Sequence, residues 1–153
     1  MGWQIAATAA IGALQYKQQG AIGKYNQSVQ DRNALVLQGQ ADQIEKKAEF
    51  DVAQFNKTYE KVEGETTVAF AKSGVEIGTG SAYNIALSNA LEKRLQENLI
   101  YYNSRVAAAN KREEARFARI KGQMAKQESK LAQIQTVAQT GSNIYSMMNK
   151  PKG

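Results

Sequence analysis

Proline occurs only once in the 153 residues, at position 151. A helix interior excludes proline because this residue lacks a backbone donor and clashes with the preceding turn. The long proline-free stretch therefore allows very long helices. Alanine, glutamine, lysine, glutamate and leucine are abundant, which is the composition of long helices and coiled coils.

Apolar and small residues recur along two stretches with a step of about 3.5 residues, the repeat of a coiled coil. The first series is Leu37, Ala41, Ile44, Ala48, Val52, Phe55, Tyr59, Val62, Thr66 and Ala69. The second series is Leu95, Leu99, Tyr102, Val106, Ala109, Glu113, Phe117, Ile120, Met124, Gln127, Leu131, Ile134, Ala138, Gly141, Tyr145 and Met148, in which Glu113 and Gln127 are polar breaks. The pattern predicts that each series forms the packed stripe of one long helix.

A glycine-rich segment, residues 74–81, separates the two series. Glycine ends helices because it adopts positive φ without strain, and serine is a good N-cap. The predicted turn residues are Gly74, Gly78, Gly80 and Ser81. We expect an all-α fold, a long antiparallel coiled-coil-like helical hairpin that assembles into an oligomer, with helices over 24–73 and 82–148.

The alanine- and glycine-rich residues 1–23, uncharged as far as Tyr16, are expected to form a separate short helix. Gly20 and Gly23 weaken a helix, so the sequence predicts a break near residues 20–24. A hairpin that turns at residues 74–81 places Gly20 near Ile134 and Ile5 near Asn149.

Charge is distributed unevenly along the chain. Residues 1–80 carry 8 basic and 9 acidic residues, whereas residues 81–153 carry 12 and 5. A basic stripe favours an anionic neighbour such as DNA or a lipid surface, although a solvated helix face explains it equally well. The residues of this possible DNA or anionic-surface contact are Arg105, Lys111, Arg112, Arg116, Arg119, Lys121, Lys126 and Lys130.

Two segments at the end of the predicted hairpin away from the turn, residues 1–16 and 131–149, are free of charge. We call them the uncharged ends. Aromatic residues that bracket an apolar stretch are typical of membrane interfaces, whereas burial in an oligomer also depletes charge. The residues predicted to make membrane or oligomer contacts are Trp3, Ile5, Ile11, Leu14, Tyr16, Ile134, Ile144, Tyr145 and Met148.

No catalytic, cofactor-binding or metal-binding residues are expected. The chain has no histidine and no cysteine, which excludes the usual zinc sites, cysteine nucleophiles and Ser-His-Asp triads. The glycine cluster lacks the Lys-Ser/Thr pair of a phosphate-binding loop. An enzyme is therefore the least favoured class.

The stretch from Ala71 to Leu87, followed by Tyr101-Tyr102-Asn103 and Arg105, resembles the internal virion (ejection) proteins of short-tailed bacteriophages. The similarity is greatest to the smallest of the three inner-core proteins of autographivirus-type podoviruses. That family combines an Ala/Gly-rich start, a Gln-rich helix, a turn containing Gly-Ser and a long second helix.

This resemblance implies a protein packed inside the capsid near the portal vertex, beside other internal virion proteins and the portal protein. It implies release with the genome and a contribution to a conduit through the host envelope, at the outer membrane. The expected partners are therefore further copies of the chain in a ring or tube, packaged DNA and outer-membrane lipid. Two alternatives remain open: a purely structural adaptor or scaffold without a membrane role, and a helical DNA-binding protein.

Overall fold

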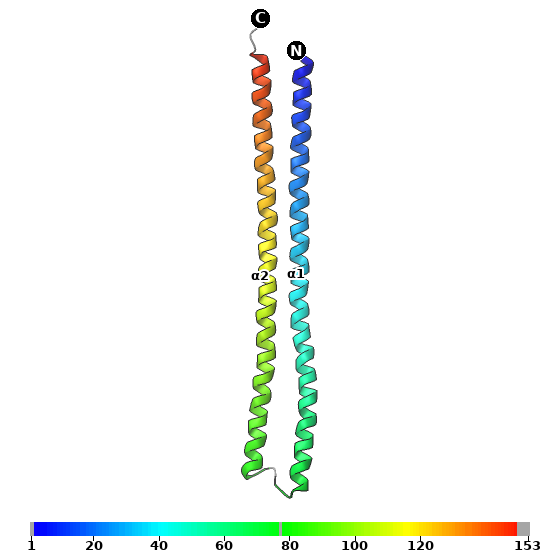
Figure 1. Ribbon diagram of the computed structural model, residues 1–153, viewed down its shortest axis with the longest axis vertical. Helices are drawn as coiled ribbons and strands as arrows, with labels where there is room; N and C mark the ends of the chain where they lie inside the picture. Colours follow the sequence, from blue (N-terminus) through cyan, green and yellow to red (C-terminus); the bar gives the residue numbers. More distant parts are fainter. Residues whose placement is uncertain (1, 77, 150–153) are drawn as a thin grey trace. The chain divides into compact units, whose positions relative to one another are not determined.

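The computed structural model describes residues 2–76 and 78–149 and consists of two long helices that pack against each other as a hairpin. Helix α1 spans Gly2–Lys72 and helix α2 spans Gly80–Met148. Figure 1 shows the two helices side by side, running in opposite directions. The predicted all-α hairpin is confirmed.

The end of α1 is a Schellman motif built on Gly74. The Val75 N–H donates to the Phe70 carbonyl at 3.2 Å, and the Gly74 N–H donates to the Ala71 carbonyl at 3.3 Å. Gly74 has a φ of 74°, the left-handed conformation that this motif requires. The predicted helix end near residue 73 and the role of Gly74 are therefore confirmed.

The start of α2 differs in detail from the prediction. Gly80 has a φ of 62° and is the first residue of α2, whereas Gly78 is outside the left-handed region. Ser81 lies inside the first turn of α2, so it does not precede the helix as an N-cap. Of the predicted turn residues, Gly74 and Gly80 supply the unusual backbone geometry.

The break predicted near residues 20–24 is absent, since α1 runs without interruption from Gly2 to Lys72. The reason lies in packing across the hairpin. A Cβ atom at Gly20 would collide with the Gln133 amide, and one at Gly23 would collide with Ser129. These glycines allow α2 to approach closely, and the contact offsets the cost of about 1 kcal/mol for each helical glycine.

The chain divides into two compact units, each a pair of helix segments. The first, called the terminal unit here, comprises Met1–Leu37 and Glu114–Gly153. The second, called the turn unit, comprises Gln38–Glu113. Among the described residues, the buried apolar side chains are alanines and Val52, so neither unit has a core of large side chains.

Candidate assembly surface

The helices of the terminal unit meet through small residues. We call this contact the small-residue seam. Ala34 on α1 packs with Ala115 and Ala118 on α2, and Leu37 lies against this cluster. The other members of the seam are Gly12, Gly20 and Gly23 on α1 and Gly122, Ser129, Thr136 and Thr140 on α2. Small side chains permit close backbone approach but bury little apolar area.

Hydrogen bonds across the seam add to this packing. The Ser129 hydroxyl donates to the Gln19 carbonyl, and the Gln133 amide donates to the Tyr16 carbonyl at 2.9 Å. The buried Thr136 hydroxyl lies 2.9 Å from Gln19 Oε1 and 3.0 Å from the Ala132 carbonyl. Each bond contributes on the order of 1 kcal/mol, so the seam is partly polar.

The second predicted series does not form the contact between the helices. All of its positions, from Leu95 to Met148, are exposed. The prediction for α2 was wrong because two stripes share the 3.5-residue repeat. The stripe of small residues faces α1, and the stripe of larger residues lies on the other side of the helix.

The first series is largely confirmed. Leu37, Ala41, Ile44, Ala48, Val52, Phe55, Tyr59 and Thr66 are buried or half-buried, and Val62 and Ala69 are exposed. In the turn unit, Phe55 and Tyr59 lie 6.2 Å apart between ring centroids. The Lys93 ammonium lies 5.1 Å from the centre of the Tyr59 ring, a cation–π contact between the two helices.

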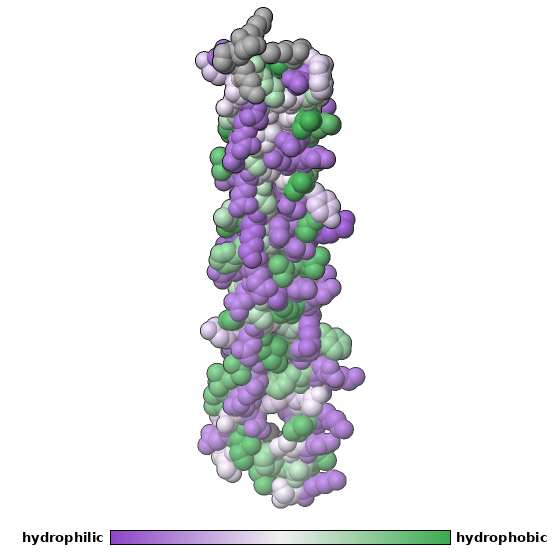
Figure 2. Space-filling model, turned by 45° about the horizontal axis from the view of Figure 1, so that its top comes forward, coloured by the Kyte–Doolittle hydropathy of each residue, from purple (hydrophilic) through white to green (hydrophobic). Residues whose placement is uncertain are grey.

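The outward-facing large residues of α2 in the terminal unit are called the α2 outer stripe. They are 49–67% exposed, and none of them faces α1. The members are Phe117, Ile120, Met124, Leu131, Ile134, Tyr145 and Met148. Figure 2 shows hydrophobic side chains on the surface of the molecule, interleaved with hydrophilic ones.

Helix α1 carries a similar set of exposed apolar residues in the terminal unit, called the α1 outer stripe. Ile22, Val29 and Val36 are seven residues apart, and Ile11 and Tyr25 are fourteen apart. Their side chains are between 38% and 70% exposed. A repeat of seven residues is typical of a second coiled-coil contact.

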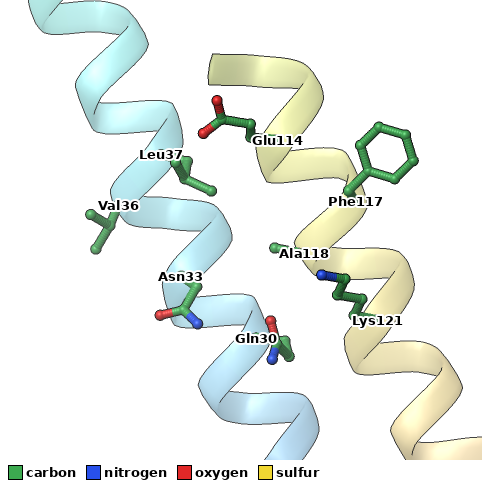
Figure 3. Close-up of a pocket in the computed structure, with 8 residues that line it drawn as sticks. All are labelled: Gln30, Asn33, Val36, Leu37, Glu114, Phe117, Ala118 and Lys121. Carbon is green, nitrogen blue, oxygen red and sulfur yellow. The ribbon is translucent and has the colours of Figure 1, made fainter. Parts of the chain in front are cut away.

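A groove of about 650 Å³ lies between the helices of the terminal unit. Leu37 and Glu114 point into the space between the helices, whereas Val36 points away from α2 and Phe117 points away from α1 (Figure 3). Leu37 and Glu114 therefore lie between the two helices, whereas Val36 and Phe117 are available for contact with another molecule.

The basic residues are partly engaged within the chain. Arg112 donates two hydrogen bonds of 2.8 Å to the two Glu45 oxygens and contacts Asp42 at 3.4 Å. The hydrogen bond from Arg112 is the main cause that lowers the pKa of Glu45, and it also raises the pKa of Arg112. Lys111 and Arg119 make further interactions of their own.

The structure places most of the predicted contact residues of the uncharged ends at the surface. Trp3, Ile11, Leu14, Tyr16, Ile134, Tyr145 and Met148 are exposed, whereas Ile5 and Ile144 are half-buried. The predicted level is confirmed within one residue, since Gly20 faces Gln133. The side chain of Ile134 itself points outward and is 65% exposed.

Among residues 2–76 and 78–149, no helix has the length and apolar character needed to cross a membrane. No family model matches the chain, and the searches of curated proteins and of solved structures found no match.

Proposed function

We propose that this chain is a non-catalytic structural subunit of a larger helical assembly. The observation that carries the proposal is the α2 outer stripe, a coiled-coil repeat of large apolar side chains that the hairpin leaves exposed. The exposed area is 11674 Å², whereas a monomeric globular protein of 16.8 kDa exposes about 7,700 Å². Apolar surface of this kind is usually covered by a partner.

The assembly that we propose is the internal core of a short-tailed bacteriophage virion, near the portal vertex. The resemblance of residues 71–105 to internal virion proteins supports this assignment. On this proposal, the subunit contacts the portal protein and other internal virion proteins. It leaves with the genome and contributes to a conduit through the host cell envelope, where the uncharged ends contact outer-membrane lipid.

A purely structural adaptor without a membrane role is the alternative. The exposed aromatic residues Trp3 and Tyr16 favour a membrane contact, because such side chains prefer the membrane interface. The basic stretch gives less support to DNA binding, since Arg112 is already paired with Glu45.

The experiment that tests the proposal is quantitative mass spectrometry of virus particles that contain the chain, before and after DNA release. We expect the chain in filled particles and its loss from emptied shells together with the genome. Full retention in the emptied shells would contradict ejection and favour the adaptor.

A further inference from the structure

We propose that a second copy of this chain covers the α2 outer stripe with its own α1 outer stripe. This inference rests on the proposed function, because it names the partner of the assembly surface. It adds the pairing of residues and the level at which the two copies meet.

The register of the hairpin determines which residues lie at the same level in the terminal unit. Gly20 faces Gln133, and Gly122 faces Gln30. These two contacts differ by one residue in register, so counting along both helices places Ile22 within one residue of the level of Leu131, Val29 of Met124, and Val36 of Phe117. Val36 and Phe117 also border the same groove, which supports this count (Figure 3).

These three level pairs repeat every seven residues on both helices. A neighbouring copy related by a rotation about an axis parallel to the helices keeps every residue at its level. Its α1 outer stripe then meets the α2 outer stripe of the first copy in three matched apolar pairs. No axial shift is needed, and the contacting helices run antiparallel.

Two further levels of the terminal unit, one between these pairs and one beyond them, are also compatible with contact. Counting from Gly122 and Gln30, Tyr25 lies level with Gln127, whose polar side chain interrupts the apolar stripe. Counting from Gly12 and Thr140, Ile11 lies level with Gly141. The glycine has open space around it and leaves room for a large side chain from the neighbour.

Charge favours α1 of a second copy over α2 as the covering helix. The segment from Phe117 to Met148, which holds the α2 outer stripe, carries four basic residues and one acidic residue, so two α2 stripes would bring like charges together. The α1 segment from Ile11 to Val36 carries three basic and one acidic residue. The resulting contact joins two different surfaces, so repetition of it closes a ring or extends a filament.

The chain has no cysteine, so single cysteine substitutions test the pairing directly. Val29→Cys and Met124→Cys chains are mixed in equal amounts, at a concentration at which the unmodified chain forms oligomers. The mixture is oxidised, and the products are separated by gel electrophoresis without reductant. We expect at least tenfold more disulfide-linked dimer in the mixture than with either variant alone. Sedimentation of the unmodified chain should show oligomers.

The matched control mixes Val29→Cys with Tyr145→Cys. Tyr145 also belongs to the α2 outer stripe, but it lies about 31 Å along the helix from Met124. We expect background cross-linking from this mixture. Equal cross-linking of both mixtures would contradict the proposed level.

Dimers from Met124→Cys alone, as abundant as in the mixture, would overturn the inference in favour of contact between two α2 helices. A monomer at all concentrations would overturn it as well. Neither result bears on the release of the chain from virus particles, so failure of this inference is distinguishable from failure of the proposed function.

Discussion

Ala34 of α1 packs against Ala115 of α2, and neither side chain exposes more than 1% of its surface. Two residues further along α2, Phe117 is 57% exposed. The hairpin therefore closes on its smallest side chains and leaves large apolar ones outside. This arrangement suits a subunit whose strongest hydrophobic contacts are made with neighbours.

Three consecutive alanines allow a direct test of the small-residue contact between the helices. Ala108 is fully buried, whereas Ala107 and Ala109 are exposed. We expect Ala108→Leu to lower the free energy of unfolding by about 1–3 kcal/mol, because the larger side chain forces the helices apart. Ala107→Leu is the matched control and should change it by less than about 0.5 kcal/mol. Urea unfolding followed by circular dichroism measures both, and equal effects would contradict the orientation of α2.

The turn depends on two glycines with positive φ. We expect Gly74→Ala and Gly80→Ala each to destabilise the hairpin by about 1–2 kcal/mol, because an L side chain is strained in the left-handed region. Gly78→Ala is the control, since Gly78 has open space around it and no positive φ. Thermal unfolding compares the three variants. A loss at Gly78 as large as at Gly74 would show that the turn is wrongly described.

The bidentate pair between Arg112 and Glu45 predicts a pH dependence. Because the pKa of Glu45 is lowered from 4.5, its contribution to stability is present above pH 4.5 and is lost as the pH falls through the lower folded value. Arg112→Gln should move the carboxyl titration of Glu45, followed by NMR, back toward 4.5. Asp42→Asn is the control and should keep the pKa of Glu45 low, because the hydrogen bond from Arg112 remains. An unchanged titration in Arg112→Gln would show that the pair does not persist in solution.

The sequence was sufficient to predict two long helices, the end of α1 and, within one residue, the level at which the helices pair. The long proline-free stretch and the glycine cluster carry that information. The face of α2 that meets α1 could not be predicted, because Ala108, Ala115 and Gly122 follow the same repeat as Met124 and Leu131. Hydrophobicity predicts that the larger side chains of α2 are buried against α1, whereas in the structure the smaller side chains are buried there. The helix break predicted at Gly20 and Gly23 was wrong because helix propensity does not show contacts between helices. In the structure, these glycines allow the close approach of α2.

The uncharged ends, residues 1–16 and 131–149, predict that the protein permeabilises lipid membranes. We expect the chain to release dye from anionic liposomes, since Trp3 and Tyr16 are exposed and no charge between residues 1 and 16 opposes interfacial insertion. Deletion of residues 2–16 should abolish the release.

The double variant Ile11→Asp and Tyr145→Asp should also abolish dye release. Both side chains point outward, so the small-residue seam remains intact. The matched control is Gln18→Asp with Gln139→Asp, two exposed polar positions. Full activity of the deletion variant would leave the structural adaptor as the better description.

Thiol reactivity tests the orientation of α2 most directly. Single variants Ala115→Cys and Phe117→Cys are treated with a thiol reagent in dilute solution and again at assembly concentration. The structure predicts slow reaction of the Ala115→Cys thiol at both concentrations. It predicts fast reaction of the Phe117→Cys thiol in dilute solution and protection on assembly. Faster reaction at position 115 than at position 117 in dilute solution would contradict a hairpin closed on small residues with its large apolar stripe outside.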